Sequence, residues 1–159
     1  MPHKEPFAQL IESKFNIRHR LDGIEIGCFK GELTHHLLSR FEKLHMITID
    51  PSCYWDDVLE NNKYHLDRIF IIPMESDKAV KHIKGLFDFI FIDGDHSYEQ
   101  CKKDILNYMP LIRPGGLIAG HNFDESNVTA HPGVHISVKE IFGMNYKLLE
   151  DFTWYVKKQ

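Results

Sequence analysis

The segment Phe87 to Ile92 is apolar at every position but one, and Asp93-Gly94-Asp95-His96 follows it at once. A short apolar run of this kind is typical of a strand that is buried on both faces, as in a parallel sheet. Ligands of open α/β sheets bind at the carboxyl ends of the strands. Two carboxylates and an imidazole in that place therefore indicate a site of chemistry rather than core packing.

Strand patterns alternate with helix patterns along the rest of the chain. Short apolar runs predict strands at residues 23–27, 46–49, 68–73, 87–92, from 117 onward, 146–150 and 153–158. Amphipathic segments predict helices at residues 6–18, 32–41, 53–66, after 76, 97–109 and 138–142. This order predicts an α/β fold with a mostly parallel sheet, a C-terminal antiparallel hairpin and helices on both faces.

Local signals predict where several of these elements begin and end. Ser76 is a candidate helix cap, and the segment Ser97 to Gln100 matches a capping box. The segment Arg113 to Gly116 (RPGG) is expected to be a turn before the fifth strand. Residues 123–136, which contain Pro132-Gly133, are expected to form a loop.

The length of 159 residues predicts a single domain with one sizeable core. We divide it into an N-terminal helix (1–20), a cofactor-binding core (22–122), an acceptor-side loop (123–136) and a final helix and hairpin (137–159). The net charge of -4 gives no electrostatic reason to expect nucleic acid as a partner.

Cysteine usage and hydropathy predict the compartment. Cys28, Cys53 and Cys101 form no CxxC pair, and an odd number does not suggest a disulfide framework. No apolar stretch is long enough to span a bilayer, and the first residues lack the apolar core of a signal peptide. We therefore expect a protein of the reducing cytoplasm without a membrane partner. The oligomeric state stays open, with a homo-oligomer as one alternative.

A glycine turn, Glu25 to Gly31 (EIGCFKG), joins the first strand to the next helix. Glycine lets a nucleotide approach the backbone closely. The dinucleotide fingerprint would need glycines at positions 27, 29 and 32, but Phe29 and Glu32 occupy the last two. Glu32 would also place negative charge where a pyrophosphate otherwise binds. The turn therefore suits a nucleoside without phosphates.

Acidic residues end the successive strands. Asp50 follows Gly27 by 23 residues, a spacing that suits hydrogen bonds to the ribose hydroxyls. Glu75 and Ser76 end the third strand, where an adenine edge would fall, and Glu25 and Asp93 would face a cationic tail. S-adenosylmethionine, an adenosine that carries a sulfonium and an ammonium, fits this pattern. The alternative is that each acid is only a solvated residue at the end of a strand.

With these residues in view, the chain resembles the class I S-adenosylmethionine-dependent methyltransferases. The segment EIGCFKG is similar to the first motif of that family, and IDGDHSYE together with RPGGLIAGH is similar to a narrower group. This group is related to sugar and catechol O-methyltransferases. The resemblance covers residues 22–158 and implies a Rossmann-like, seven-stranded sheet whose last two strands form a reversed hairpin.

The resemblance also implies a set of cofactor-binding residues: Glu25, Gly27, Cys28, Phe29, Gly31, Asp50, Pro51, Glu75, Ser76 and Asp93. Relatives often carry Ser or Thr where this chain has Leu33, and whether Thr34 takes over the methionine carboxylate stays open.

His96 and Asp93 are the candidate catalytic residues. Methyl transfer to a hydroxyl needs alignment of the reactants and removal of a proton, and a neutral imidazole can take that proton. A structural role for His96, satisfied by the loop backbone, is the alternative. Asp93, His121 and Asn122 are candidate ligands for Mg²⁺ or Ca²⁺, although His121 would favour a softer ion or none.

We therefore expect methyl transfer to a small-molecule acceptor, above all to a hydroxyl of a sugar or another polyhydroxylated metabolite. Residues 123–136 should line the acceptor pocket, with His131 and His135 as candidate contacts, unless they form only a solvated loop. Two alternatives stay open: a non-catalytic S-adenosylmethionine-binding domain and a nucleotide-dependent oxidoreductase on a similar fold.

Overall fold

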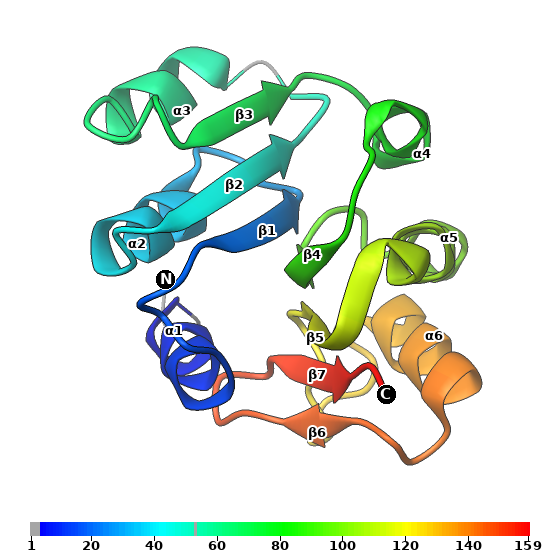
Figure 1. The fold of residues 1–159 in the computed structure, drawn as a ribbon. Helices are drawn as coiled ribbons and strands as arrows, with labels where there is room; N and C mark the ends of the chain where they lie inside the picture. Colours follow the sequence, from blue (N-terminus) through cyan, green and yellow to red (C-terminus); the bar gives the residue numbers. More distant parts are fainter. Residues whose placement is uncertain (1–3, 53) are drawn as a thin grey trace.

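A seven-stranded sheet forms the centre of the molecule. A computed structural model describes residues 4–52 and 54–159. The sheet order is β3-β2-β1-β4-β5-β7-β6, in which the first five strands are parallel and β7 runs antiparallel to both its neighbours (Figure 1). The strands are β1 (Leu21–Ile26), β2 (Leu44–Ile49), β3 (Ile69–Ile72), β4 (Phe87–Ile92), β5 (Ile112–Gly120), β6 (Lys147–Leu148) and β7 (Trp154–Lys157). The expected α/β fold with its C-terminal hairpin is confirmed.

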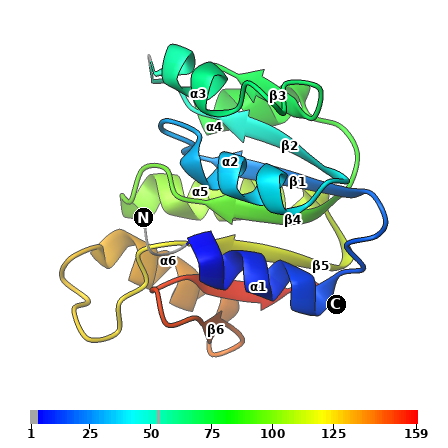
Figure 2. The ribbon, with the colours of Figure 1, turned by 90° about the vertical axis from the view of Figure 1, so that its left-hand side faces the viewer.

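Helices cover both faces of this sheet. They are α1 (Lys4–Lys14), α2 (Glu32–Arg40), α3 (Trp55–Asn61), α4 (Ser76–Ala79), α5 (Tyr98–Tyr108) and α6 (Pro132–Phe142), with short 3₁₀ turns η1 (Val80–His82) and η2 (Met109–Leu111). In Figure 1 α1, α2 and α3 lie to the left of the sheet, and α4, α5 and α6 lie to its right. Figure 2 shows α1 and α2 in front of the sheet. Because both faces are covered, β4 is buried along its whole length.

The register brings the carboxyl ends of the central strands to one level. Ile26 of β1 pairs with Ile49 of β2 on one side and with Ile92 of β4 on the other. The next residue of each strand therefore begins its loop at the same edge of the sheet. This edge carries Gly27, Asp50 and Asp93, which the sequence analysis placed at strand ends.

The segment Arg113 to Gly116 is not the expected turn but part of β5. Its register with β4 shifts between Phe87 and Phe89, so that the extra residues form an irregularity within the strand. The C-terminal segment also pairs with it, since the Gly115 N–H donates to the Lys158 carbonyl at 2.9 Å. The Pro114-Gly115 pair thus lies in a β-bulge within β5, and the neighbouring segments on both sides still form hydrogen bonds with this strand.

The expectation of a loop up to residue 136 was also wrong, because α6 already begins at Pro132. Proline is favourable at a first helical position because its missing N–H would have no helical partner there. Ser76 is not a cap: Glu75 holds the cap position, and the Ser76 hydroxyl instead donates to Asp104. Ser97 does cap α5 through its side chain. The helices expected at 6–18 and 53–66 are shorter than predicted, and Cys53 and residues 1–3 lie outside the described residues.

Candidate active site

A cavity of about 600 Å³ lies at the carboxyl edge of the sheet. The turns after β1, β2, β3 and β4 line it, together with side chains from α5. Its lining includes the acidic residues Asp50, Glu75, Asp77, Asp93, Asp95 and Asp104, and neither lysine nor arginine is among the described residues of this lining. The cavity therefore favours a ligand with positive charge and no phosphate.

Gly27 lets the turn after β1 pack against the loop after β4. Its φ of 81° lies in the left-handed region, and an added Cβ would lie 2.3 Å from the carbonyl oxygen of Asp93. Only glycine permits both the conformation and the close approach. Phe29, in the same turn, also has a positive φ of 48°, and its ring contacts that of Tyr54 at 4.7 Å between centroids.

Asp50 connects this turn to the end of β2. Its Oδ2 accepts a hydrogen bond from the Phe29 N–H at 2.8 Å, and its Oδ1 accepts one from the Ser52 N–H at 2.8 Å. Both bonds fix the carboxylate at the cavity wall, beside Pro51. A carboxylate oxygen can accept more than one bond, so acceptor capacity remains for ribose hydroxyls.

Glu25 lies behind the cavity wall rather than in the lining. It is 3% exposed, and its carboxylate accepts a hydrogen bond from the Thr34 hydroxyl on α2. Burial raises the pKa of Glu25 to about 8, the Thr34 bond opposes this shift, and the nearby Asp93 adds to it. Since the Thr34 hydroxyl is directed to Glu25, nothing supports the alternative in which Thr34 holds a methionine carboxylate.

Cys28 and Gly31 also lie outside the cavity lining. Cys28 is buried, and burial raises the pKa of its thiol far above the usual range, which makes it a poor nucleophile. Gly31 is the cap residue of α2, with a φ of 72°, and an added Cβ would lie 2.8 Å from the Asn62 side chain. These two residues shape the turn rather than the cavity surface.

A polar network closes the cavity on the side of β3 and α5. The Ser76 hydroxyl donates to the Asp104 carboxylate at 2.5 Å, and the Gln100 amide donates to the same carboxylate at 2.9 Å. Burial raises the pKa of Asp104, which is 1% exposed. The sequence analysis missed Gln100 and Asp104. Their spacing of one helical turn on a capped helix after the IDGD segment was the available signal.

Asp93 and His96 lie together in the loop after β4. His96 Nε2 is 3.3 Å from Asp93 Oδ1, while Asp93 itself lines the cavity. The ring of His131 contacts that of His96, with 4.6 Å between centroids and an interplanar angle of 67°. The two proposed catalytic residues thus adjoin the cavity, and a second imidazole from the segment before α6 joins them.

The geometry at His121 does not fit a metal ligand. Its Nδ1 lies 3.0 Å from Asn122 Oδ1, and its Nε2 lies 2.8 Å from the carbonyl oxygen of Asp151. Both ring nitrogens are therefore engaged within the protein. Residues 4–52 and 54–159 contain no group of three His, Cys, Asp or Glu side chains that could hold a metal ion. A role of Asp93 and Asn122 in binding Mg²⁺ or Ca²⁺ stays a prediction.

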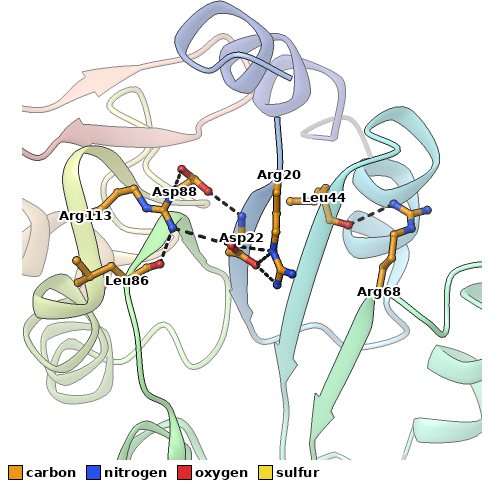
Figure 3. A network of polar contacts seen from close by, with 7 residues as sticks. All are labelled: Arg20, Asp22, Leu44, Arg68, Leu86, Asp88 and Arg113. Carbon is orange, nitrogen blue, oxygen red and sulfur yellow. Dashed lines mark hydrogen bonds and ion pairs between the residues drawn. The ribbon is translucent and has the colours of Figure 1, made fainter. Parts of the chain in front are cut away.

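The opposite edge of the sheet contains a second cavity of about 500 Å³, whose lining holds residues of both charges, among them Arg20, Asp22 and Arg68. Figure 3 shows Arg20 against Asp22, at 2.8 Å, and Arg113 against the buried Asp88, at 3.0 Å. Asp88 also accepts a hydrogen bond from the Asp22 N–H at 2.7 Å. These acids hold strand ends together, whereas the acids of the carboxyl edge line a cavity, and of them Glu75 pairs with Lys78 at 2.6 Å.

A family model described as "Methyltransferase domain" matches residues 24–123. This match spans β1 to β5 and the loops that line the acidic cavity. The chain belongs to this methyltransferase family. The expected resemblance to class I S-adenosylmethionine-dependent methyltransferases is thereby confirmed.

Solved structures of this methyltransferase fold are similar over nearly the whole chain. An O-methyltransferase from Bacillus cereus in complex with SAH has 21% identity and a TM-score of 0.75, over 99% of this chain and 82% of that one. The O-methyltransferase TomG from Streptomyces achromogenes, solved with SAM, has 13% identity and a TM-score of 0.77, over 99% and 80%. A TDP-rhamnose 3'-O-methyltransferase of calicheamicin biosynthesis has 14% identity and a TM-score of 0.73, over 99% and 80%.

None of the curated proteins compared with the chain matches it. In the part of the chain that the structure describes, no helix is long and apolar enough to cross a membrane.

Proposed function

We propose that this methyltransferase transfers a methyl group to a hydroxyl of a small-molecule acceptor, a sugar or another polyhydroxylated metabolite. The observation that supports this most is the acidic cavity at the carboxyl edge, whose described lining holds carboxylates and no lysine or arginine. Such a lining suits the cations of S-adenosylmethionine and disfavours the phosphates of a dinucleotide.

The cavity residues fit this cosubstrate. S-adenosylmethionine supplies the methyl group as a sulfonium. Asp50, fixed by two backbone N–H groups, would bind the ribose hydroxyls, and Glu75 and Ser76 would adjoin the adenine. Asp93 would face the cationic end, with Glu25 behind it. Gly27, Phe29 and Pro51 would shape the wall.

His96 would accept the proton of the acceptor hydroxyl. Its bond to Asp93 orients the ring, and an imidazole is basic enough to take a proton near neutral pH. In this arrangement Asp93 would contact both the cosubstrate and His96. The acceptor oxygen would thereby lie in line with the methyl group.

The sugar acceptor rests on the histidines of this site and on one structural neighbour. That neighbour is a TDP-rhamnose 3'-O-methyltransferase. Several imidazoles next to Asp93 suit an acceptor that carries more than one hydroxyl, because each ring can donate or accept a hydrogen bond.

We further propose a cytoplasmic protein, without nucleic acid or membrane partners, in which a homo-oligomer would cover the exposed site.

Calorimetry and a transfer assay test this proposal. We expect S-adenosylmethionine to bind and NADH not to bind, and labelled methyl to reach a hydroxylated acceptor in a metabolite extract. His96→Ala should abolish transfer and keep cosubstrate binding, whereas His82→Ala, at an exposed histidine of η1, should transfer normally. Binding of NADH alone would favour the oxidoreductase, and binding without any transfer would favour the non-catalytic domain.

A further inference from the structure

The start of α6 is docked onto the loop that carries His96. An added Cβ at Gly133 would lie 2.3 Å from the carbonyl oxygen of His96 and 2.4 Å from the Tyr98 nitrogen. No side chain fits between these two segments. The Ser137 hydroxyl, one turn further along α6, contacts the Tyr98 carbonyl at 3.1 Å. The Pro132-Gly133 pair therefore permits close packing of α6 against the catalytic loop.

A polar cluster on the surface holds α6 against α5. The Tyr98 hydroxyl donates to Glu140 Oε2 at 2.6 Å, and Lys102 Nζ lies 2.7 Å from Glu140 Oε1. Together with the contact at Gly133, this cluster fixes α6 at both ends of its buried face. The residues at the start of α6 are thus held in a defined position relative to His96.

Two histidines occupy this position, one helical turn apart. His131 stacks edge-to-face on the ring of His96. His135 is only 5% exposed and lies 4.2 Å, between centroids, from the ring of Phe123, which follows Asn122. Neither ring nitrogen of His135 has a hydrogen-bond partner among the described residues. A buried imidazole without a partner is unfavourable, so this ring is expected to bond a group that comes from outside the chain.

We infer that the start of α6 forms the acceptor-binding wall of the site, and that His131 and His135 bond hydroxyl groups of the acceptor while His96 faces the hydroxyl that reacts. His131 and His135 lie one helical turn apart, and two separate imidazoles suit an acceptor with several hydroxyls better than a single phenol. This inference rests on the proposed function and specifies its acceptor as a molecule with several hydroxyls.

The test compares His131→Phe and His135→Phe with the matched control His82→Phe. Phenylalanine keeps an aromatic ring at each position and removes the nitrogens. The probes are TDP-rhamnose, free hexoses and catechol, with labelled S-adenosylmethionine, and the best acceptor of the wild type is used throughout. We expect the acceptor KM to rise about 5- to 10-fold in each site variant, with the S-adenosylmethionine Kd and the melting temperature unchanged.

A second measurement covers variants that fail to fold. In wild-type protein with ¹⁵N-labelled histidine and bound S-adenosylhomocysteine, the ring nitrogens of His131 and His135 should shift when the acceptor is added, and those of His82 should not. Unchanged acceptor KM values, or unshifted ring nitrogens, would overturn this inference and leave methyl transfer standing. Absence of transfer by the wild type to any acceptor would overturn both.

Discussion

The Asp50 carboxylate accepts a hydrogen bond from the Phe29 N–H at 2.8 Å, and so ties the end of β2 to the glycine turn after β1. The turn holds Phe29 at a positive φ, which few side chains adopt. Asp50 therefore has two tasks in the proposed site. It stabilises the turn against which the cosubstrate lies, and it presents an oxygen to the ribose.

Asp50→Asn tests this double role. An amide has only one acceptor oxygen, so its NH₂ group would face either the Phe29 or the Ser52 N–H. Loss of a hydrogen bond to a charged group costs about 1.5–3 kcal/mol, so we expect the Kd for S-adenosylmethionine to rise about 10- to 100-fold in calorimetry. The exposed Asp56→Asn should bind as the wild type does. Equal affinity of the two variants would contradict the role of Asp50.

Glu25 should make the stability of the ligand-free protein depend on pH. Its pKa in the folded state is about 8, against a usual value of 4.5, so between these values the folded protein holds a proton that the unfolded chain releases. The free energy of unfolding should therefore fall as pH rises from about 4.5 to 8, by at most about 1.4 kcal/mol per pH unit for this one group. Urea unfolding at several pH values measures this slope.

Glu25→Gln should flatten that slope and keep the bond from Thr34, because an amide oxygen also accepts. The exposed Glu99→Gln serves as the control and should keep the wild-type slope.

Glu25→Gln should also weaken S-adenosylmethionine binding, since a nearby cation favours the ionised carboxyl that this variant lacks. Wild-type binding should release a proton, seen as a buffer-dependent heat, and strengthen as pH rises toward 8. A buffer-dependent heat that persists in Glu25→Gln would exclude Glu25 as the source.

The sequence predicted the strand-end residues because a single physical rule places them. Parallel strands end at one edge, so Asp50, Glu75 and Asp93 were expected around one ligand, and they line one cavity. Glu25 was expected there too, but its side chain points to the face of β1 that α2 covers, where the Thr34 hydroxyl donates a hydrogen bond to it. Side-chain direction at the last residues of a strand depends on the register, which short apolar runs do not fix.

Contacts between segments far apart in the chain could not be predicted from the sequence. Gln100 and Asp104 reach the cavity only because α5 folds back over β4, and Gly133 meets His96 only because α6 packs on α5. The Pro132-Gly133 pair signalled a loop by composition, whereas tertiary packing makes it the start of a helix. Local propensity yields to packing at such positions.

Gly27→Ala should separate close packing from backbone strain. Gly115 is the matched control, since its φ of 82° equals that of Gly27 within a degree, yet an added Cβ there meets nothing within 4 Å. Alanine in the left-handed region costs about 1–2 kcal/mol at either position. At Gly27 the overlap with the Asp93 carbonyl should add about 1–3 kcal/mol in urea unfolding and abolish S-adenosylmethionine binding. Similar losses of stability in the two variants would argue against the close approach.

Asp88→Ala should affect stability and leave the site intact, because Asp88 belongs to the opposite edge of the sheet (Figure 3). The substitution removes the acceptor of the Asp22 N–H and the partner of Arg113, two bonds that join β1, β4 and β5. We expect a loss of about 1–3 kcal/mol in urea unfolding. Arg20→Ala, which breaks an exposed pair on the same edge, should cost less than about 1 kcal/mol.

The S-adenosylmethionine Kd of these variants tests whether the carboxyl edge of the sheet binds the ligand while the opposite edge contributes only to stability. Folded Asp88→Ala protein should bind with the affinity of the wild type, since the paired charges at Asp88 do not reach the acidic cavity. Asp50→Asn should instead weaken binding, since its carboxylate lines the cavity. If Asp88→Ala instead weakened binding tenfold while Asp50→Asn did not, the ligand would lie at the amino edge, and the assignment of the active site would be wrong.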